Sequence, residues 1–136
     1  MSDFEFKVAF PGGVRVATEY DGFVINTDQP VEDGGENTAP GPFILFLASL
    51  ATCAGYYVAA FCLSRKISTD GIGLTMKAER DAKGKMISLV TFEISLPPDF
   101  PEKYVGAVIR AAETCTVKAH LQFPPDIETK AAIRKG

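Results

Sequence analysis

The sequence predicts one α+β domain, in which antiparallel sheets surround a long buried central helix in the order β-β-β-α-β-β-α-β. Three patterns in the 136 residues support this prediction. The first 27 residues alternate apolar and polar side chains between turn residues, an uncharged run of 21 residues follows, and alternating segments then return around a second helical pattern. The length suits a single domain, which we expect to span residues 1–136.

Composition excludes several functional classes. The net charge is −3 and no run of basic residues exceeds two, which argues against binding to nucleic acid or to an anionic membrane. One histidine and three cysteines without a C-x-x-C motif provide too few clustered ligands for a structural metal site. The N-terminus has no basic start followed by an apolar run, so we expect no secretory signal and a cytoplasmic protein with reduced thiols.

The N-terminal segment reads as three antiparallel strands. Residues 4–10 alternate as a half-buried strand does, with four apolar side chains on one face: Phe4, Phe6, Val8 and Phe10. Turn residues at 11–13 and the pair Asp21-Gly22 separate further strands, which we expect over 14–20 and 23–27. A long loop rich in Pro, Gly and acidic residues follows over 28–42, and loops of this length are often functional.

The uncharged segment 43–63 is long enough to cross a membrane, so two interpretations compete. Its flanks lack an aromatic belt, and its many Ala, Gly, Ser and Thr residues suit close packing against other elements. The predicted strands also need an apolar partner, and this segment is the largest apolar surface available. We therefore expect a buried central helix, with a single-pass membrane protein as the competing hypothesis.

The second half of the chain predicts two strands, a helix and a last strand. The strands are expected over 71–80 and 85–96, on either side of a tight turn. The helix begins at Pro101-Glu102 with Asp99 as a possible cap, and ends beside Cys115. Alternating apolar positions predict a final strand over 117–123.

Cys53 and Cys62 face opposite sides of the predicted helix, since nine residues at 100° per residue amount to a half-turn. Cys62 is therefore expected to be a core residue. Phe46, Tyr56 and Tyr57 share the face of Cys53, at positions i−7, i+3 and i+4, and are candidate substrate-binding residues. From these residues alone, Cys53 is either a reactive thiol or another buried core residue.

The segment from Pro42 to Cys53, PFILFLASLATC, resembles the central helix of the OsmC/Ohr hydroperoxide reductases. AETCTVKAHL, residues 112–121, resembles the part of that family that holds its second cysteine. The separation of the two cysteines and the predicted element order are also similar to those of the family, over essentially the whole chain. The resemblance implies a thiol-dependent peroxidase for organic hydroperoxides that acts in oxidative-stress defence as an intertwined cytoplasmic homodimer.

The resemblance also implies residue roles. Cys53 would be the peroxidatic residue and Cys115 the resolving one, and a dithiol reductant, such as a lipoylated protein, would reopen their disulfide without any bound cofactor. Apolar burial raises a thiol pKa, and the N-terminus of the helix of Cys53 is too distant to lower it. A cation is therefore needed, and Arg15 in the segment GGVRV occupies a place similar to that of the family's arginine.

The sequence departs from the family pattern where relatives carry a glutamate that holds this arginine, because Phe43 stands there. Four nearby acids are candidate substitutes: Glu32, Asp33, Glu36 and Glu113. This departure keeps a second hypothesis open, a non-catalytic dimer that binds a hydrophobic ligand in the groove around Cys53. A depressed pKa of the Cys53 thiol favours catalysis, whereas a pKa near or above the free value of about 8.5 favours ligand binding.

Overall fold

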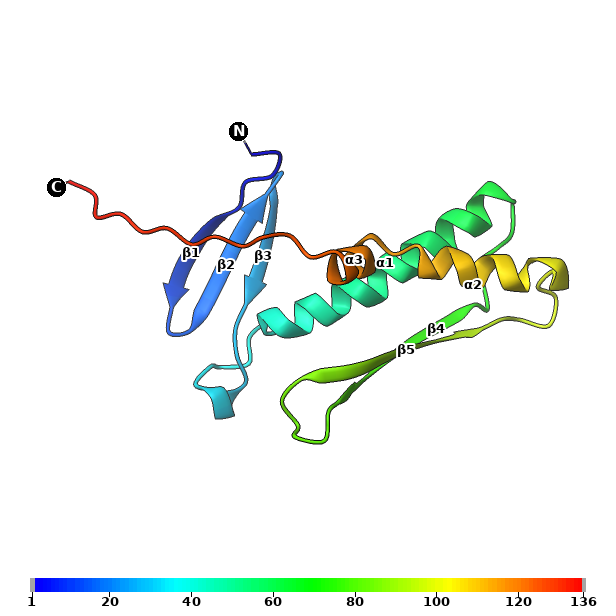
Figure 1. Ribbon diagram of the computed structural model, residues 1–136, viewed down its shortest axis with the longest axis horizontal. Coiled ribbons are helices and arrows are strands. Elements are labelled where there is room, and N and C mark those ends of the chain that lie inside the picture. The colour runs from blue at the N-terminus through cyan, green and yellow to red at the C-terminus, as the bar shows by residue number, and fades with distance from the viewer. Residues whose placement is uncertain (1, 136) are drawn as a thin grey trace. The chain divides into compact units, whose positions relative to one another are not determined.

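The computed structural model describes residues 2–135, and its α+β class with antiparallel sheets confirms the predicted fold class. The elements are labelled in Figure 1 and follow in order: β1 (Lys7–Gly12), β2 (Arg15–Tyr20), β3 (Phe23–Thr27), η1 (Val31–Asp33), α1 (Pro42–Ser64), β4 (Gly73–Arg80), β5 (Ile87–Ser95), η2 (Glu102–Tyr104), α2 (Val105–Glu113) and α3 (Thr116–Gln122). The chain divides into two compact units, one up to Ser49 and the other from Leu50 onward.

The first unit contains the antiparallel sheet β1-β2-β3. Its second hairpin turns at Asp21 and Gly22, whose φ angles of 52° and 82° are both positive. A two-residue turn with both φ angles positive matches the twist of the flanking strands, so the turn predicted from Asp21-Gly22 is confirmed. Arg15 begins β2, where its Nε donates a hydrogen bond to the carbonyl oxygen of Gly12 at 3.3 Å.

The loop after β3 is organised around Asp28, which is 1% exposed. Its carboxylate accepts hydrogen bonds from the hydroxyl of Thr38 at 2.7 Å and from the backbone N–H groups of Gln29, Glu36 and Thr38. Gly35 is required here, because a Cβ at that position would overlap the carbonyl of Gln29. The predicted long loop is thus an ordered structure built on one buried carboxylate.

The hydrogen bonds to Asp28, first of all the one from the Thr38 hydroxyl, lower its pKa from 3.8 to about 2. As pH falls from about 4 toward 2, the unfolded chain takes up the proton before the folded chain does, so the free energy of unfolding decreases. We expect Asp28→Asn to lower stability at pH 7 and to flatten this acid limb. Urea unfolding between pH 2 and 7 measures both effects, and Asp33→Asn, which changes an exposed carboxyl in the same loop, is the control. Parallel pH curves for the wild type and Asp28→Asn would contradict the assignment.

The second unit has its core where α1, α2 and the β4–β5 hairpin meet. Val58 and Cys62 of α1 and Val108 and Ala112 of α2 form the buried cluster. Several partly buried apolar side chains pack against it, namely Phe61, Ile67, Ile72, Ile94, Leu96 and Phe100. Strands β4 and β5 pair in antiparallel register from Gly73↔Ser95 to Arg80↔Ile87. Figure 1 shows the hairpin and α2 running alongside this part of α1.

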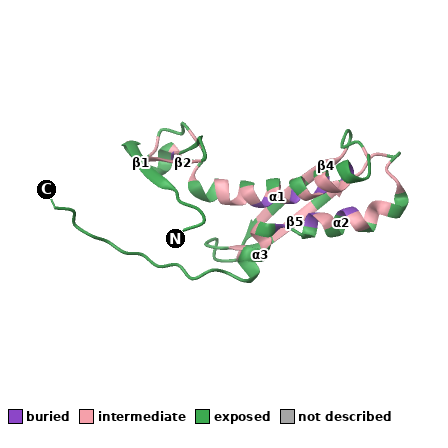
Figure 2. Cartoon of the chain, turned by 90° about the horizontal axis from the view of Figure 1, so that it is seen from above, coloured by how far each residue is buried: buried purple, intermediate pink, exposed green. Residues whose placement is uncertain are grey.

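Within this single chain, helix α1 is buried along one stripe, and its other faces are half-buried or exposed. Of its 23 residues, four at a spacing of four are buried, Leu50, Ala54, Val58 and Cys62. Figure 2 marks them in purple between exposed and half-buried positions. One chain supplies packing partners for one face only, and Tyr56 and Leu63 remain 64% and 81% exposed. Among the described residues, α1 is also the one helix long and apolar enough to span a membrane.

The predicted last strand over 117–123 is wrong, because residues 117–122 belong to helix α3 and Phe123 is its C-cap residue. The observed order of the main elements is therefore β-β-β-α-β-β-α-α. Val117 and Leu121 are four residues apart, which suits a helix face as well as a strand face, and Lys, Ala, Leu and Gln favour helix. The cap predicted for the preceding helix is also wrong, since Pro101 rather than Asp99 occupies the N-cap position of η2.

Candidate active site

Cys53 and Cys115 meet within the second unit. Cys53 lies in α1 and is half-buried, and Cys115 is the buried N-cap residue of α3. Both are free thiols, and each is close enough to the other to shift the pKa of its thiol. The structure thus brings together the two cysteines that the resemblance assigned as a redox pair.

The pKa of the Cys53 thiol is lowered from its ordinary value of 9.0. The largest cause is a hydrogen bond from the backbone N–H of Val117, and the thiol of Cys115 and the N–H of Thr116 act in the same direction. Burial opposes them by raising the pKa. Because hydrogen bonds to a charged form favour that form, the first turn of α3 stabilises a thiolate at Cys53.

The pKa of the Cys115 thiol is raised, chiefly by burial, and also by the neighbouring Cys53. The backbone N–H of Lys118 partly offsets this by donating a hydrogen bond to the Cys115 Sγ at 3.4 Å. The pair is therefore asymmetric, because the surroundings favour the thiolate form at Cys53 and the protonated form at Cys115. That is the arrangement in which one cysteine attacks an electrophile and the other follows.

Cys62 is the core residue that its position predicted. Its side chain is 0% exposed, and burial raises the pKa of its thiol. A buried, protonated thiol is unreactive, so Cys62 takes no part in the site.

Two tyrosines adjoin the cysteine pair. The rings of Tyr56 and Tyr57 contact each other edge to face, with centroids 5.0 Å apart. The Oη of Tyr57 and the Oγ1 of Thr116 form a 2.8 Å hydrogen bond between α1 and the first residue of α3. Tyr56 is mostly exposed, so it can contact a substrate that approaches from solvent.

Arg15 and Phe46, the other predicted site residues, belong to the first unit. Phe46 stacks on Phe43 with ring centroids 5.7 Å apart, so the position that replaces the family glutamate holds an aromatic pair instead. Among the residues that the structure describes, the one ion pair joins Lys77 and Glu93. Arg15 is therefore not paired with any described acid of the first unit. The roles assigned to Arg15 and Phe46 beside Cys53 stay predictions.

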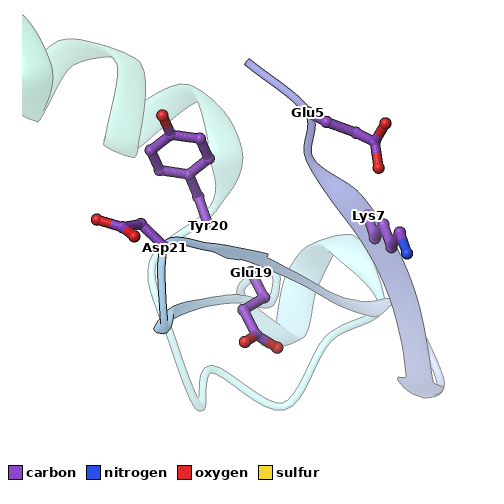
Figure 3. Close-up of a pocket in the computed structure, with 5 residues that line it drawn as sticks. All are labelled: Glu5, Lys7, Glu19, Tyr20 and Asp21. Atoms are coloured by element: carbon purple, nitrogen blue, oxygen red, sulfur yellow. The ribbon is translucent and has the colours of Figure 1, made fainter. Parts of the chain in front are cut away.

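Both units also have a surface hollow. In the second unit, a groove of about 540 Å³ lies between β5 and the helices α2 and α3; Cys115 lines it together with apolar residues that include Val90, Phe92, Ile94, Val105 and Ile109. The hollow of the first unit, about 530 Å³, is lined by charged side chains and one tyrosine, which Figure 3 shows: Glu5, Lys7, Glu19, Tyr20 and Asp21. No group of three metal-ligating side chains occurs within residues 2–135.

Sequence reasoning missed the backbone donors of Thr116 and Val117, because a strand was expected there. It also missed Asp28, which a general loop pattern does not single out. The signal for α3 was available in the helix-favouring residues after Cys115, since a cysteine followed by such a run is compatible with an N-cap. No comparable signal distinguishes Asp28 from the other acids of its loop.

Comparison with protein-family models gives a match. The OsmC family model, described as OsmC-like protein, matches residues 34–130, which is more than half of the chain. Comparison with curated protein sequences gives no match.

Solved structures share the fold. A Psychrobacter arcticus protein with a proposed role in osmotic stress and detoxification has a TM-score of 0.72 at 23% identity, with 88% of each chain covered. The organic hydroperoxide resistance protein OsmC of Legionella pneumophila has a TM-score of 0.54 at 21% identity, with 90% of this chain and 92% of that one covered. The organic hydroperoxide resistance protein OhrB of Bacillus subtilis has a TM-score of 0.51 at 25% identity, with 88% and 92% covered.

Proposed function

Because this chain belongs to the OsmC-like protein family, we propose that it is a thiol peroxidase that reduces organic hydroperoxides in oxidative-stress defence. The observation that supports the proposal most is the asymmetric pair Cys53 and Cys115, with hydrogen bonds that favour a thiolate at the first and burial that favours a thiol at the second. Two of the three solved structures described above are named organic hydroperoxide resistance proteins.

In the first step, the Cys53 thiolate attacks the terminal oxygen of R–O–O–H. The S–O bond forms as the O–O bond breaks, and the departing alkoxide takes up a proton and leaves as the alcohol. Cys53 becomes a sulfenic acid, so its sulfur is oxidised by two electrons and the peroxide is reduced by two. The N–H groups of Val117 and Thr116 favour the thiolate form that makes this attack.

In the second step, the sulfur of Cys115 attacks the sulfur of the sulfenic acid. The S–S bond forms, and the hydroxide that leaves combines with the Cys115 proton to give water. A dithiol reductant, such as a lipoylated protein, then opens the disulfide by thiol–disulfide exchange, becomes a disulfide itself and restores both thiols. No bound cofactor takes part in these steps.

The predicted substrate contacts remain part of the proposal. Phe46, Tyr56 and Tyr57 would hold the organic group of the hydroperoxide, since aromatic rings with a polar tip suit a substrate that is partly apolar. Arg15 would add a positive charge beside the Cys53 thiolate. The amides of α3 already lower the pKa of the Cys53 thiol, so less positive charge is needed from Arg15. The glutamate that would hold this arginine, at the position of Phe43, is then also less necessary.

The experiment that tests the function is a single turnover. Fully reduced protein is mixed with one equivalent of cumene hydroperoxide without added thiol, and both the peroxide and the free thiols are counted. We expect the peroxide to be consumed while two of the three thiols are lost. Persistence of the peroxide beside three free thiols would overturn the proposal.

We also propose that the protein is a cytoplasmic homodimer. The outer faces of α1 and of the N-terminal sheet expose large apolar side chains, among them Phe10 at 80%, Phe23 at 71% and Leu63 at 81%. A second copy of the chain would remove such surfaces from water, and a membrane would do so for α1 alone. Light scattering of detergent-free protein is expected to give twice the 14.6 kDa chain mass. Protein that stays in solution only with detergent would contradict this proposal.

The apolar groove beside Cys115 favours a second candidate function, the binding of a hydrophobic ligand without chemistry. The groove is lined by Cys115, whereas the sequence hypothesis placed such a groove around Cys53. The single turnover separates the two functions, because ligand binding alone leaves all thiols reduced.

A further inference from the structure

Resting on the proposed thiol chemistry, we propose that the hydroxyl pair Tyr57–Thr116 is a positioning device that holds the first turn of α3 against Cys53. The pair spans 59 residues of sequence and joins two helices through one 2.8 Å hydrogen bond between Oη and Oγ1. Tyr57 and Thr116 are thus positioning residues, which act on Cys53 through the backbone of α3.

The placement of the two residues supports this role. Tyr57 follows Cys53 by one helical turn, so both side chains leave the same face of α1. Thr116 directly follows Cys115 and provides the first backbone N–H of α3. The hydrogen bond therefore connects a residue one helical turn after Cys53 to the residue directly after Cys115.

Few other features of α3 hold the helix in its position. It is seven residues long and contains no buried residue, and its last three residues and the chain after it, up to Lys135, are exposed. A helix this short is marginal without tertiary contacts. Rotation or fraying of its first turn would remove the Val117 and Thr116 amides from Cys53 and would move Cys115, the N-cap residue.

The hydrogen bond is solvent-exposed, so its effect on global stability and its effect on the reactivity of Cys53 are expected to differ in size. An exposed hydrogen bond contributes little to global stability, because water replaces it readily in the unfolded chain. The same bond can still control reactivity, since small displacements of a donor change the stabilisation of a thiolate. The variants are therefore expected to change Cys53 chemistry much more than folding.

The test uses Thr116→Val, Tyr57→Phe and the double variant, in the full reduced protein. Alkylation of Cys53 by iodoacetamide is followed from pH 5 to 10 by peptide mass spectrometry. We expect each single variant to raise the apparent pKa of Cys53 and to slow its alkylation at pH 7 by roughly three- to tenfold, the size expected from one hydrogen bond. The double variant should be no slower than the single ones, because both remove the same interaction.

Controls isolate the hydroxyl pair. Thr116→Ser keeps the hydroxyl and should restore the wild-type profile. Thr114 lies two residues before Thr116, and its hydroxyl donates a hydrogen bond to the Arg110 carbonyl. Thr114→Val removes that hydroxyl and should leave the profile unchanged. The titratable side chains near the pair include Glu113, Lys118 and His120, whose Nδ1 lies 2.8 Å from the Thr116 carbonyl oxygen, and all three stay the same in every variant.

Wild-type profiles in Thr116→Val and Tyr57→Phe, or a Thr116→Ser profile like that of Thr116→Val, would overturn the positioning role. Additive effects in the double variant would overturn it as well. Because iodoacetamide replaces the peroxide, this outcome is independent of peroxidase activity. A protein that fails the single turnover but shows the expected profiles would lose the proposed function and keep the positioning pair.

Discussion

Replacing Cys53 by serine abolishes hydroperoxide reduction, with an expected fall in kcat/KM of roughly a thousandfold or more. The hydroxyl of serine is a far weaker nucleophile than the thiolate that the α3 amides stabilise at this position. Consumption of cumene hydroperoxide in the presence of a dithiol measures the loss. Substantial activity in Cys53→Ser would contradict the role of Cys53.

The other two cysteines provide matched variants. Cys115→Ser is expected to consume one equivalent of peroxide and to stop at a sulfenic acid on Cys53, which dimedone traps, because no second thiol is present to resolve it. Cys62→Ala should retain the first turnover and the disulfide, since Cys62 lies in the core and away from the pair. If Cys62→Ala lost its reactivity at a temperature where it is folded, the assignment of the reactive thiol to Cys53 would be contradicted.

Val108→Ala has the largest expected effect on stability, about 2 kcal/mol. Val108 is 0% exposed and joins α2 to the stripe of α1 formed by Val58 and Cys62, so its truncation leaves a cavity in the centre of the second unit. Urea unfolding measures the change. Val31→Ala, the same truncation at a side chain that is 69% exposed, is the control and should cost much less.

The same variant links the core to the site. Helix α2 ends at Glu113, and Cys115 follows after one residue, so a loosened α2 also loosens the resolving cysteine. We expect Val108→Ala to slow disulfide formation more than it slows the first attack by Cys53. Equal unfolding midpoints for Val108→Ala and Val31→Ala would contradict the observed core.

Strong local signals predicted most of the fold. The alternation in the N-terminal strands and the turn at Asp21-Gly22 depend on neighbouring residues, so they were visible in the sequence. The uncharged run likewise predicted α1. Its burial was not predictable from a pattern, because the run is apolar on all sides while the chain covers one stripe only.

The site was predicted in part for a similar reason. Cys53 and Cys115 were assigned through the family resemblance, whereas the donors to Cys53 depend on α3 being a helix. Val117, Ala119 and Leu121 alternate as in a strand, but the segment forms a helix, which agrees with the helix propensity of its Lys, Ala, Leu and Gln residues. Sequence reasoning therefore looked for a cation at Cys53, although backbone amides already lower the pKa of its thiol.

The central claim is that Cys53 and Cys115 form one redox pair, and a disulfide map tests it most directly. Reduced protein is treated with one equivalent of cumene hydroperoxide, the remaining thiols are blocked, and the peptides are identified by mass spectrometry without reduction. We expect rapid formation of a Cys53–Cys115 disulfide, with Cys62 recovered as a blocked thiol. Three blocked thiols, or a disulfide that includes Cys62, would contradict the account.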